Sequence, residues 1–272
     1  MVKDKNDENL RAVAGILKEG KVVCLTGAGI SYESGIPTFR GKGGLWEEYD
    51  PEVYANMPGL VSVLRGDPGK FVKFLSDFYS VLLEAKPNPG HLSLCYLEKN
   101  GLLDAVVTQN IDNLHQSSGT RSVVELHGNA FRVYCQGCGA KISLEKERVR
   151  EMMSLLERAP KSRRGLLSIF SRYCPRCAGC GGRYRIDIVL FGENLPEEAL
   201  DRSWELLNSC KTLLVVGTSL VVYPAASFPV QAKRNGARII EINPEPSAQS
   251  GIADYRIYGP AGKVLPELVK LL

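Results

Sequence analysis

Five of the eight cysteines in this 272-residue chain gather in two short stretches. Cys135-Gln-Gly-Cys138 has the C-x-x-C spacing, which lets two thiolates face one metal ion. The second stretch holds two overlapping pairs with the same spacing, Cys174 with Cys177 and Cys177 with Cys180. Two such pairs across a long insert predict one structural zinc ion with four sulfur ligands. The spacing alone leaves the choice within the second stretch open.

A glycine pair follows the first strongly apolar run of the chain. Residues 22–26 have the composition of a buried strand, and Gly27 and Gly29 come directly after it. Glycines at that place let the backbone turn tightly and approach a pyrophosphate, as in dinucleotide-binding folds. The third glycine of the G-x-G-x-x-G pattern is replaced by Tyr32, and the next glycine is Gly35. An ordinary dehydrogenase is therefore disfavoured.

Two other apolar runs are followed by polar side chains that could do chemistry. Gln109, Asn110 and Asp112 follow one run, and His127 follows another, with Gly128 behind it. An imidazole with a pKa of about 6.5 suits reversible proton transfer near neutral pH. A lone histidine at a strand end is more often a satisfied polar residue than a base, and Asn and Asp are also common turn formers.

Apolar runs that alternate with amphipathic stretches predict the scaffold that would position these groups. Strands are expected at residues 22–26, 105–108, 123–126, 189–191, 212–216 and 238–242. Helices are expected at 71–84, 91–99, 196–208 and 224–235, and an ordered loop over a ligand at 41–58. The alternation predicts an α/β fold with a Rossmann-like, doubly wound parallel sheet. Ligands bind such sheets at the carboxyl ends of the strands, where the polar clusters fall.

The net charge is mild, but its distribution is uneven. The chain carries a formal charge of +4 at pH 7. Between residues 141 and 172, nine basic side chains stand against four acidic ones, a surplus larger than that of the whole chain. The surplus is compatible with a landing site for an acidic or nucleic-acid-bound partner, although a solvated face is the commoner reason for such a stretch.

The composition excludes several classes of protein. The chain is 44% hydrophobic and 24% charged, as is usual for a globular protein. It has no run of 18 apolar residues, so no membrane span is expected. Its first nine residues are polar and lack the apolar centre of a secretory signal. We therefore expect a cytoplasmic protein, in which clustered cysteines bind metal rather than form disulfides.

The stretch from residue 27 to residue 40 resembles the signature of the sirtuins, the NAD-dependent protein deacylases. The matching positions are Gly27, Ala28, Gly29, Ser31, Ser34, Gly35, Ile36, Pro37, Phe39 and Arg40. The resemblance implies a Rossmann-like NAD-binding domain over residues 1–45, 86–133 and 187–272. It also implies a helical sub-module over residues 46–85 and a small zinc-binding module over residues 134–186. The implied reaction transfers the acyl group of an acyl-lysine to ADP-ribose and releases nicotinamide.

The same resemblance implies the residues of the site. His127, as general base, and Asn110 are expected to be catalytic. NAD is expected to contact Gly27, Ala28, Gly29, Ser31, Pro37, Phe39, Arg40, Trp46, Gln109, Asn110, Ile111, Asp112, Gly217, Thr218, Ser219, Asn243, Pro244, Glu245 and Ala261. The acylated peptide is expected to bind by strand addition at Val189, Phe191, Gly192 and Val222. The family places its last zinc ligand eleven positions before the residue equivalent to Phe191, which selects Cys177 and Cys180 as the partners of Cys135 and Cys138, with Cys174 and Cys177 as the alternative pair.

The resemblance also bears on the acyl group and on the alternatives. Family members that favour succinyl or malonyl groups carry Tyr-x-x-Arg, whereas here Tyr79 is followed by Leu82, so neutral acyl groups are expected. The alternatives are mono-ADP-ribosyl transfer and a non-catalytic zinc-ribbon module that binds nucleic acid through residues 141–172. The expected partners are acylated lysine peptides or proteins, with chromatin-type or nucleic-acid-bound proteins among the candidates. No membrane partner and no direct nucleic-acid binding are expected.

Overall fold

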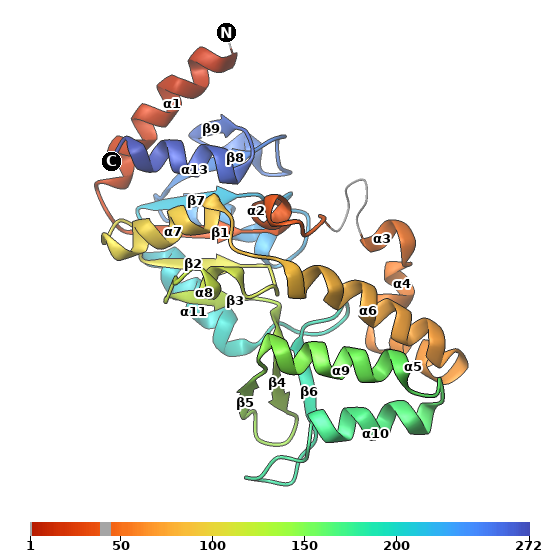
Figure 1. Cartoon of the computed structure of the whole chain (residues 1–272). Helices are drawn as coiled ribbons and strands as arrows, with labels where there is room; N and C mark the ends of the chain where they lie inside the picture. Colours follow the sequence, from red (N-terminus) through yellow and green to blue (C-terminus); the bar gives the residue numbers. More distant parts are fainter. Residues whose placement is uncertain (1, 39–44) are drawn as a thin grey trace.

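The large sheet of the fold has six parallel strands. The structure is a computed structural model that describes residues 2–38 and 45–272. The strands are β1 (Val22–Thr26), β2 (Ala105–Thr108), β3 (Val123–Glu125), β7 (Thr212–Val216), β8 (Arg238–Asn243) and β9 (Tyr255–Tyr258). Their order is β3-β2-β1-β7-β8-β9, and every neighbouring pair is parallel (Figure 1). The predicted doubly wound parallel sheet is thus confirmed.

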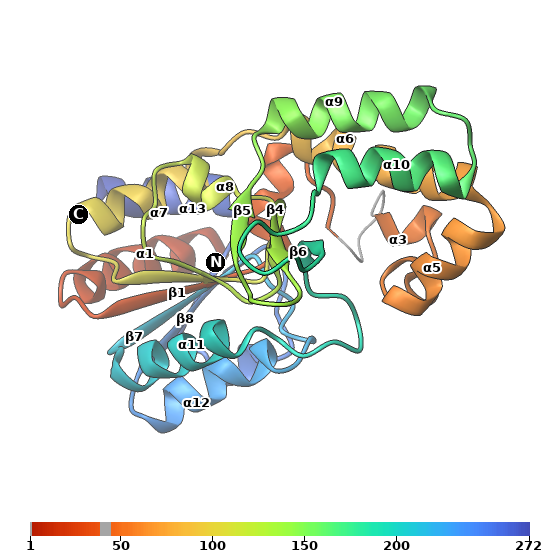
Figure 2. The ribbon, with the colours of Figure 1, turned by 90° about the horizontal axis from the view of Figure 1, so that it is seen from below.

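Helices cover both faces of this sheet, as Figure 2 shows. The helices α1 (Val2–Leu17), α7 (Pro89–Lys99) and α13 (Ala261–Lys270) share one core with Val22, Cys24 and other strand residues that point the same way. The helices α11 (Glu197–Ser209) and α12 (Phe228–Arg234) share a second core with Val23 and Leu25. Alternate residues of β1 enter opposite cores, which is why residues 22–25 are all apolar rather than alternating with polar residues.

A second, smaller sheet has three antiparallel strands. They are β4 (Gly128–Cys135), β5 (Lys141–Ser143) and β6 (Tyr184–Ile188), in the order β5-β4-β6. The prediction of a parallel strand at residues 189–191 is wrong. Strand β6 ends at Ile188, and the amide of Leu190 donates to the carboxylate of Glu193 in a turn. A three-residue apolar run has too little length to distinguish a strand from such a turn.

Five further helices form a third core beside the small sheet. They are α4 (Pro51–Tyr54), α5 (Met57–Gly66), α6 (Pro68–Glu84), α9 (Lys146–Arg158) and α10 (Arg163–Tyr173), and the short helix α3 (Leu45–Glu48) precedes α4. Side chains of α6, including Phe74 and Tyr79, pack with Met152 of α9 and Leu166 of α10. The helical sub-module and the insert of the small module therefore share one hydrophobic core.

The loop expected over residues 41–58 is wrong where the structure describes it. Residues 45–58 contain α3, α4 and the start of α5. The side chains of Asp50 and Asn56 cap α4 and α5, and each of these helices has a proline in its first turn. A capping Asp or Asn with a nearby proline is a helix-start signal. Because α3 and α4 have only four residues each, they show no helical periodicity that would have supported this signal.

The basic insert is largely built into the fold. Five of its nine cations make polar contacts, and Lys146 is the clearest case. Its Nζ donates to the carbonyls of Leu82, Leu83 and Ala85 at 3.2, 3.3 and 3.0 Å, and so closes the carboxyl end of α6. Arg150 pairs with Glu84 of the same helix at 3.3 Å.

The short elements complete the fold. They are α2 (Ala28–Ser31), the 3-10 turns η1 (Tyr32–Ser34), η2 (Ala225–Ser227) and η3 (Ser250–Ile252), and α8 (Leu114–Ser117). Within residues 2–38 and 45–272, the structure contains no helix with the length and hydropathy that a membrane span requires.

Candidate functional site

Four loops leave the large sheet from the same ends of its strands. Thr26, at the end of β1, is level with Thr108 on β2 and Val216 on β7. The residue after each strand continues the pairing, since Gln109 N donates to Thr26 O at 3.0 Å and Gly27 N to Val216 O at 3.2 Å. The polar loops after β1, β2, β7 and β8 are therefore side by side at the carboxyl ends of the strands, where parallel sheets bind ligands.

Glycines bring two of these loops into backbone contact. A Cβ atom at Gly29 would stand 2.7 Å from Gly217 Cα, and one at Gly27 would stand 2.7 Å from Thr218 Cβ. Gly217 has φ +60, in the left-handed region that glycine tolerates best. The structure thus gives Gly27 and Gly29 a packing role against the loop after β7, in addition to the access that the sequence suggested.

Three polar side chains meet where the loops after β1 and β2 face each other. Ser31 Oγ donates to Asp112 Oδ2 at 2.7 Å, and Asn110 Nδ2 donates to Ser31 Oγ at 3.0 Å and to Gly27 O at 3.1 Å. All three side chains are buried. Burial raises the pKa of Asp112, and the hydrogen bonds from Ser31 and Leu114 N partly oppose the rise. The cluster is a compact set of donors and acceptors suited to a polar ligand.

Two buried histidines lie behind this cluster. The rings of His91 and His115 are 4.9 Å apart, and His115 Nε2 is 3.0 Å from Thr26 Oγ1. Burial lowers the pKa of His91 to about 4 and that of His115 well below its ordinary value. Both rings are therefore neutral near pH 7. His91 also takes part in the capping box that begins α7.

His127 lies between the two sheets, after β3 and before β4. Its Nδ1 is 2.9 Å from the carbonyl oxygen of Gln109. Because a carbonyl can only accept, Nδ1 carries the proton, and the lone pair of the neutral ring is on Nε2. Burial lowers the pKa of His127, with the bond to Gln109 opposing the shift. The ring is thus held neutral, and its Nε2 can accept a proton.

The next polar contacts lie on the other side of β1. Gln109 Nε2 donates to Thr218 Oγ1 at 2.9 Å, and Asn243 Nδ2 donates to Thr218 O at 2.9 Å. Ser219, Pro244 and Glu245 are exposed beyond them, whereas Ala261 is buried at the start of α13. The structure brings the loop after β2 together with the loops after β7 and β8.

Sequence reasoning missed Glu241 in this region. Its buried carboxylate accepts bonds from Ser247 N at 2.9 Å, Ser250 Oγ at 2.5 Å and Asn243 Nδ2 at 3.2 Å. Burial acts to raise the pKa of Glu241, but these bonds outweigh it and hold the pKa below its usual range. The signal was present, since Glu241 is the one charged residue among the apolar residues Ile239, Ile240 and Ile242.

The structure describes only some of the other predicted ligand contacts. Phe39 and Arg40 fall outside the described residues, as does the side chain of Trp46. Pro37 and Ile111 are half-buried, and the carbonyl of Ile111 accepts a bond from Ala130 N at 2.8 Å. Ala28 begins α2, between Gly27 and Gly29.

One of the predicted peptide-binding residues is hydrogen-bonded to the backbone of His127. Val189 N donates to His127 O at 2.9 Å, and Phe191 N donates to Ala55 O at 2.8 Å. The Phe191 side chain is 52% exposed, Gly192 is exposed, and Val222 is half-buried with exposed Val221 and Tyr223 on either side. Two exposed apolar segments, 189–192 and 221–223, thus remain available for contact with a partner.

The structure brings together four cysteines of the small module. The Sγ atoms of Cys135, Cys138, Cys177 and Cys180 all lie within 4.8 Å of one another, and the Cys135–Cys180 and Cys138–Cys177 pairs are 3.4 and 3.7 Å apart. Sulfur atoms around tetrahedral zinc, with zinc–sulfur bonds of about 2.3 Å, stand about 3.8 Å apart. The cluster therefore fits a closed, structural zinc site. Half-buried Cys174 is not one of the four.

Comparisons with known proteins agree with this arrangement. A family model described as the Sir2 family matches residues 27–224. The NAD-dependent protein deacylase of Pyrococcus furiosus is 44% identical over 256 residues, which cover 94% of each chain. The NAD-dependent protein deacylase 2 of Pyrobaculum aerophilum is 45% identical over 259 residues, which cover 95% of this chain and 94% of the relative.

Solved structures show the same likeness. A Sir2 homologue in complex with NAD is 38% identical, with a TM-score of 0.75 and coverage of 95% of this chain and 92% of that chain. A Sir2 protein with a p53 peptide and NAD+ is 34% identical, with a TM-score of 0.75 and coverage of 95% and 96%.

Proposed function

The chain belongs to the Sir2 family of NAD-dependent protein deacylases, and we propose that His127 is the general base of its reaction. The observation that carries the proposal is the contact between His127 Nδ1 and Gln109 O. It fixes the tautomer in which Nε2 accepts a proton, at the edge of the sheet where the polar loops meet. The lowered pKa of His127 keeps that nitrogen unprotonated at neutral pH.

The chemistry of the side chains at the strand ends suits NAD. When bound, NAD supplies the sugar carbon that receives the acyl oxygen and the nicotinamide that departs. Asn110 and Asp112 offer an amide and a carboxylate for the carboxamide and ribose of the nicotinamide half. Thr218, Ser219 and Asn243 offer hydroxyl and amide groups on the opposite side of β1. With NAD bound, His127 would take a proton from a ribose hydroxyl, and that oxygen would attack the acyl carbon.

The substrate is an acylated lysine in an extended peptide. The segments 189–192 and 221–223 would bind it by backbone pairing, and the exposed side chains of Phe191, Val221 and Tyr223 would pack on it. Backbone pairing makes few demands on peptide sequence, which favours a broad range of protein substrates. Proteins bound to nucleic acid remain among the candidates. The part of the basic insert that is tied into α6 is less available to attract them.

The acyl group would be neutral. Leu82 occupies the position at which a cation would meet an acidic acyl chain, and its side chain is buried. Lys146 lies at the same end of α6, but its Nζ is bonded to three backbone carbonyls. Acetyl and longer neutral chains are therefore preferred over succinyl or malonyl groups, whose carboxylate would be desolvated without a partner.

A cytoplasmic location is consistent with the thiols. All eight cysteines are free of disulfides, and four of them form the zinc-type cluster. Thiols persist in a reducing compartment.

Mass spectrometry of an acetyl-lysine peptide, with and without NAD, tests the proposal. The wild type should deacetylate the peptide only with NAD, and His127→Ala should lose activity by roughly 100-fold or more, the usual range for a general base. Thermal unfolding of both proteins controls for folding. Equal turnover by a folded His127→Ala protein would remove His127 from this role. If the enzyme consumed NAD without the peptide and ADP-ribose from labelled NAD became attached to a protein, the result would instead support mono-ADP-ribosyl transfer.

A further inference from the structure

His127 stands where the chain passes from the parallel sheet into the small antiparallel sheet. Glu125 ends β3, Gly128 begins β4, and only Leu126 and His127 lie between the two strands. Gly128 has φ +79, and a Cβ atom there would stand 2.0 Å from Asp187 O. The turn that presents His127 is thus pressed against β6, so its geometry depends on how β6 is held.

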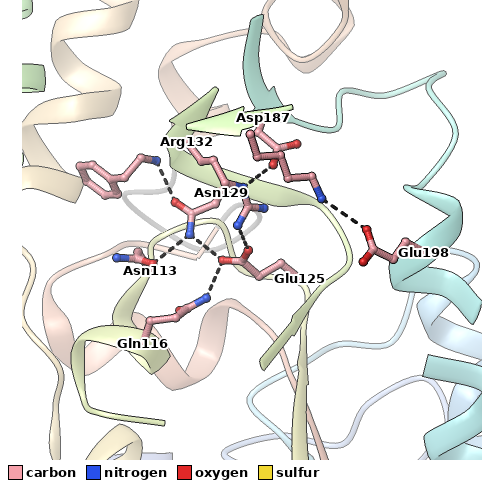
Figure 3. A network of polar contacts seen from close by, with 9 residues as sticks. Asn113, Gln116, Glu125, Asn129, Arg132, Asp187 and Glu198 are labelled. Carbon is pink, nitrogen blue, oxygen red and sulfur yellow. Dashed lines mark hydrogen bonds and ion pairs between the residues drawn. The ribbon is translucent and has the colours of Figure 1, made fainter. Parts of the chain in front are cut away.

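One guanidinium holds both sides of this junction. Arg132 NH1 pairs with Glu125 Oε2 at 2.6 Å, and Arg132 Nε pairs with Asp187 Oδ2 at 2.6 Å (Figure 3). Glu125 is two residues before His127. Asp187 is two residues before Val189, whose amide bonds to the His127 carbonyl. Arg132 therefore closes a ring of contacts around the His127–Gly128 peptide.

The second carboxylate oxygen of Glu125 extends the contacts to the loop after β2. Glu125 Oε1 accepts bonds from Gln116 at 2.7 Å and from Asn129 at 2.5 Å, and Asn129 also donates to Asn113 Oδ1 at 2.9 Å. Figure 3 shows these side chains converging on the Glu125 carboxylate. The loop that supplies Gln109, the hydrogen-bond partner of His127 Nδ1, is thereby tied to the same network.

The groups in this network are well removed from water. The side chains of Glu125 and Asp187 are 8% and 9% exposed, and that of Arg132 is 22% exposed. Burial by itself would lower the pKa of Arg132, but the two carboxylates outweigh it and raise the pKa. Two buried carboxylates without their cation would have to admit water or take up new positions.

We propose that Arg132 is a positioning residue for His127, because its fork to Glu125 and Asp187 fixes the turn that holds the imidazole against Gln109. Arg132 itself does not touch the imidazole. The consequence for catalysis rests on the proposed role of His127, whereas the consequence for the geometry of the ring does not. Lysine cannot reproduce the fork, because its single nitrogen lacks the planar pair of donors that meets two carboxylates at once.

Nitrogen NMR of 15N-histidine-labelled protein tests the geometry directly, since the chain has only three histidines. In the wild type, His127 should show one tautomer, with the proton on Nδ1, and a pKa below 6.5. In Arg132→Gln the ring should mix tautomers and its pKa should rise toward 6.5 as water enters. His91 and His115 should be unchanged. The control Lys141→Gln removes an exposed cation of the same small sheet, 3.8 Å from Glu198, and should leave all three signals in place.

Activity is measured on the same proteins. Arg132→Gln should lower kcat/KM by on the order of 10- to 100-fold, the effect of a small displacement of a catalytic group, with the acid limb of its pH profile moved upward. Arg132→Lys should recover thermal stability but not the single tautomer, and it carries the test if Arg132→Gln does not fold. An unchanged His127 signal in a folded variant would overturn the proposal. A shifted signal together with full activity of His127→Ala would uphold it and overturn the role of His127.

Discussion

Ser31 Oγ donates a hydrogen bond of 2.7 Å to Asp112 Oδ2 and so joins the loop after β1 to the loop after β2. These residues are 81 positions apart in the chain, and they meet because β1 and β2 are neighbours with their ends in register. The bond favours the charged form of Asp112, whose pKa burial raises. Ser31 thus opposes the rise that burial imposes on the pKa of Asp112.

Replacing Ser31 with alanine should lower the catalytic efficiency of the protein with NAD. A hydrogen bond to a charged group contributes about 1.5–3 kcal/mol, so kcat/KM for NAD should fall roughly tenfold or more. The pKa of Asp112 should rise further, which moves the acid limb of the pH profile to higher pH. Initial rates from pH 5 to 9 measure both effects. Ser93→Ala is the matched control, because the Ser93 hydroxyl donates to Pro89 O within α7. Coincident profiles for Ser31→Ala and wild type would contradict this prediction.

The zinc ligands are testable by metal content. Wild type and Cys174→Ser should each retain about one zinc ion per chain, whereas Cys180→Ser should lose it. Of these two cysteines, Cys180 belongs to the cluster of four sulfur atoms and Cys174 does not. Elemental analysis after dialysis provides the measurement. Chelation should also unfold the small module, since binding of structural zinc contributes directly to folding. Zinc loss in Cys174→Ser with retention in Cys180→Ser would reverse the assignment.

The parallel sheet could be predicted because its sequence signals are local. Residues 22–26 and 212–216 are buried at every position and apolar except for Thr26 and Thr212, as suits strands covered on both faces, and the polar residues that follow mark the strand ends. The C-x-x-C spacing likewise reports a geometry that neighbouring residues determine. These features needed no knowledge of which segments pair.

The features that escaped prediction depend on distant partners or on short segments. Strand β9 is an edge strand of four residues in which only Ile257 is buried, so its apolar signal is weak. Arg132 lies 55 positions from Asp187, and nothing in the local sequence announces their pairing. The shared core of α6, α9 and α10 also joins segments that the sequence separates by more than 60 residues.

Acid should destabilise the protein through its buried histidines. His91 has a pKa of about 4 in the folded chain, against about 6.5 when unfolded. Between these values the unfolded chain binds more protons than the folded chain. The stabilising contribution is therefore present above pH 6.5 and is lost as the pH falls toward 4. Thermal unfolding of wild type and His91→Gln from pH 7 to 4.5, with zinc content checked at each pH, should show a shallower decline in the variant. Parallel curves would contradict the prediction.

Lys146 should stabilise the contact between α9 and α6. Its Nζ donates to three carbonyls at the carboxyl end of α6, where a cation is favoured. Lys146→Met keeps most of the aliphatic stem but should cost about 1–2 kcal/mol of unfolding free energy. Arg150→Met is the control, because its pairs with Glu84 and Glu147 are exposed and should contribute about 0–1 kcal/mol. Denaturant titration separates the two, and equal losses would show that the carbonyl cluster adds nothing.

The proposed acyl preference rests on the apolar surroundings of Leu82. A succinyl carboxylate placed beside this buried side chain would lose its water without gaining a cation, at a cost of several kcal/mol. Acetyl-lysine peptides should therefore be turned over on the order of 100-fold more efficiently than the same peptides with succinyl-lysine. Leu82→Arg should narrow that ratio, whereas the volume-conserving control Leu82→Met should preserve it. Competition between the two peptides in one reaction, followed by mass spectrometry, measures the ratio directly. Preferential removal of succinyl by the wild type would mean that another cation reaches the acyl group, and Lys146 would be the first residue to replace.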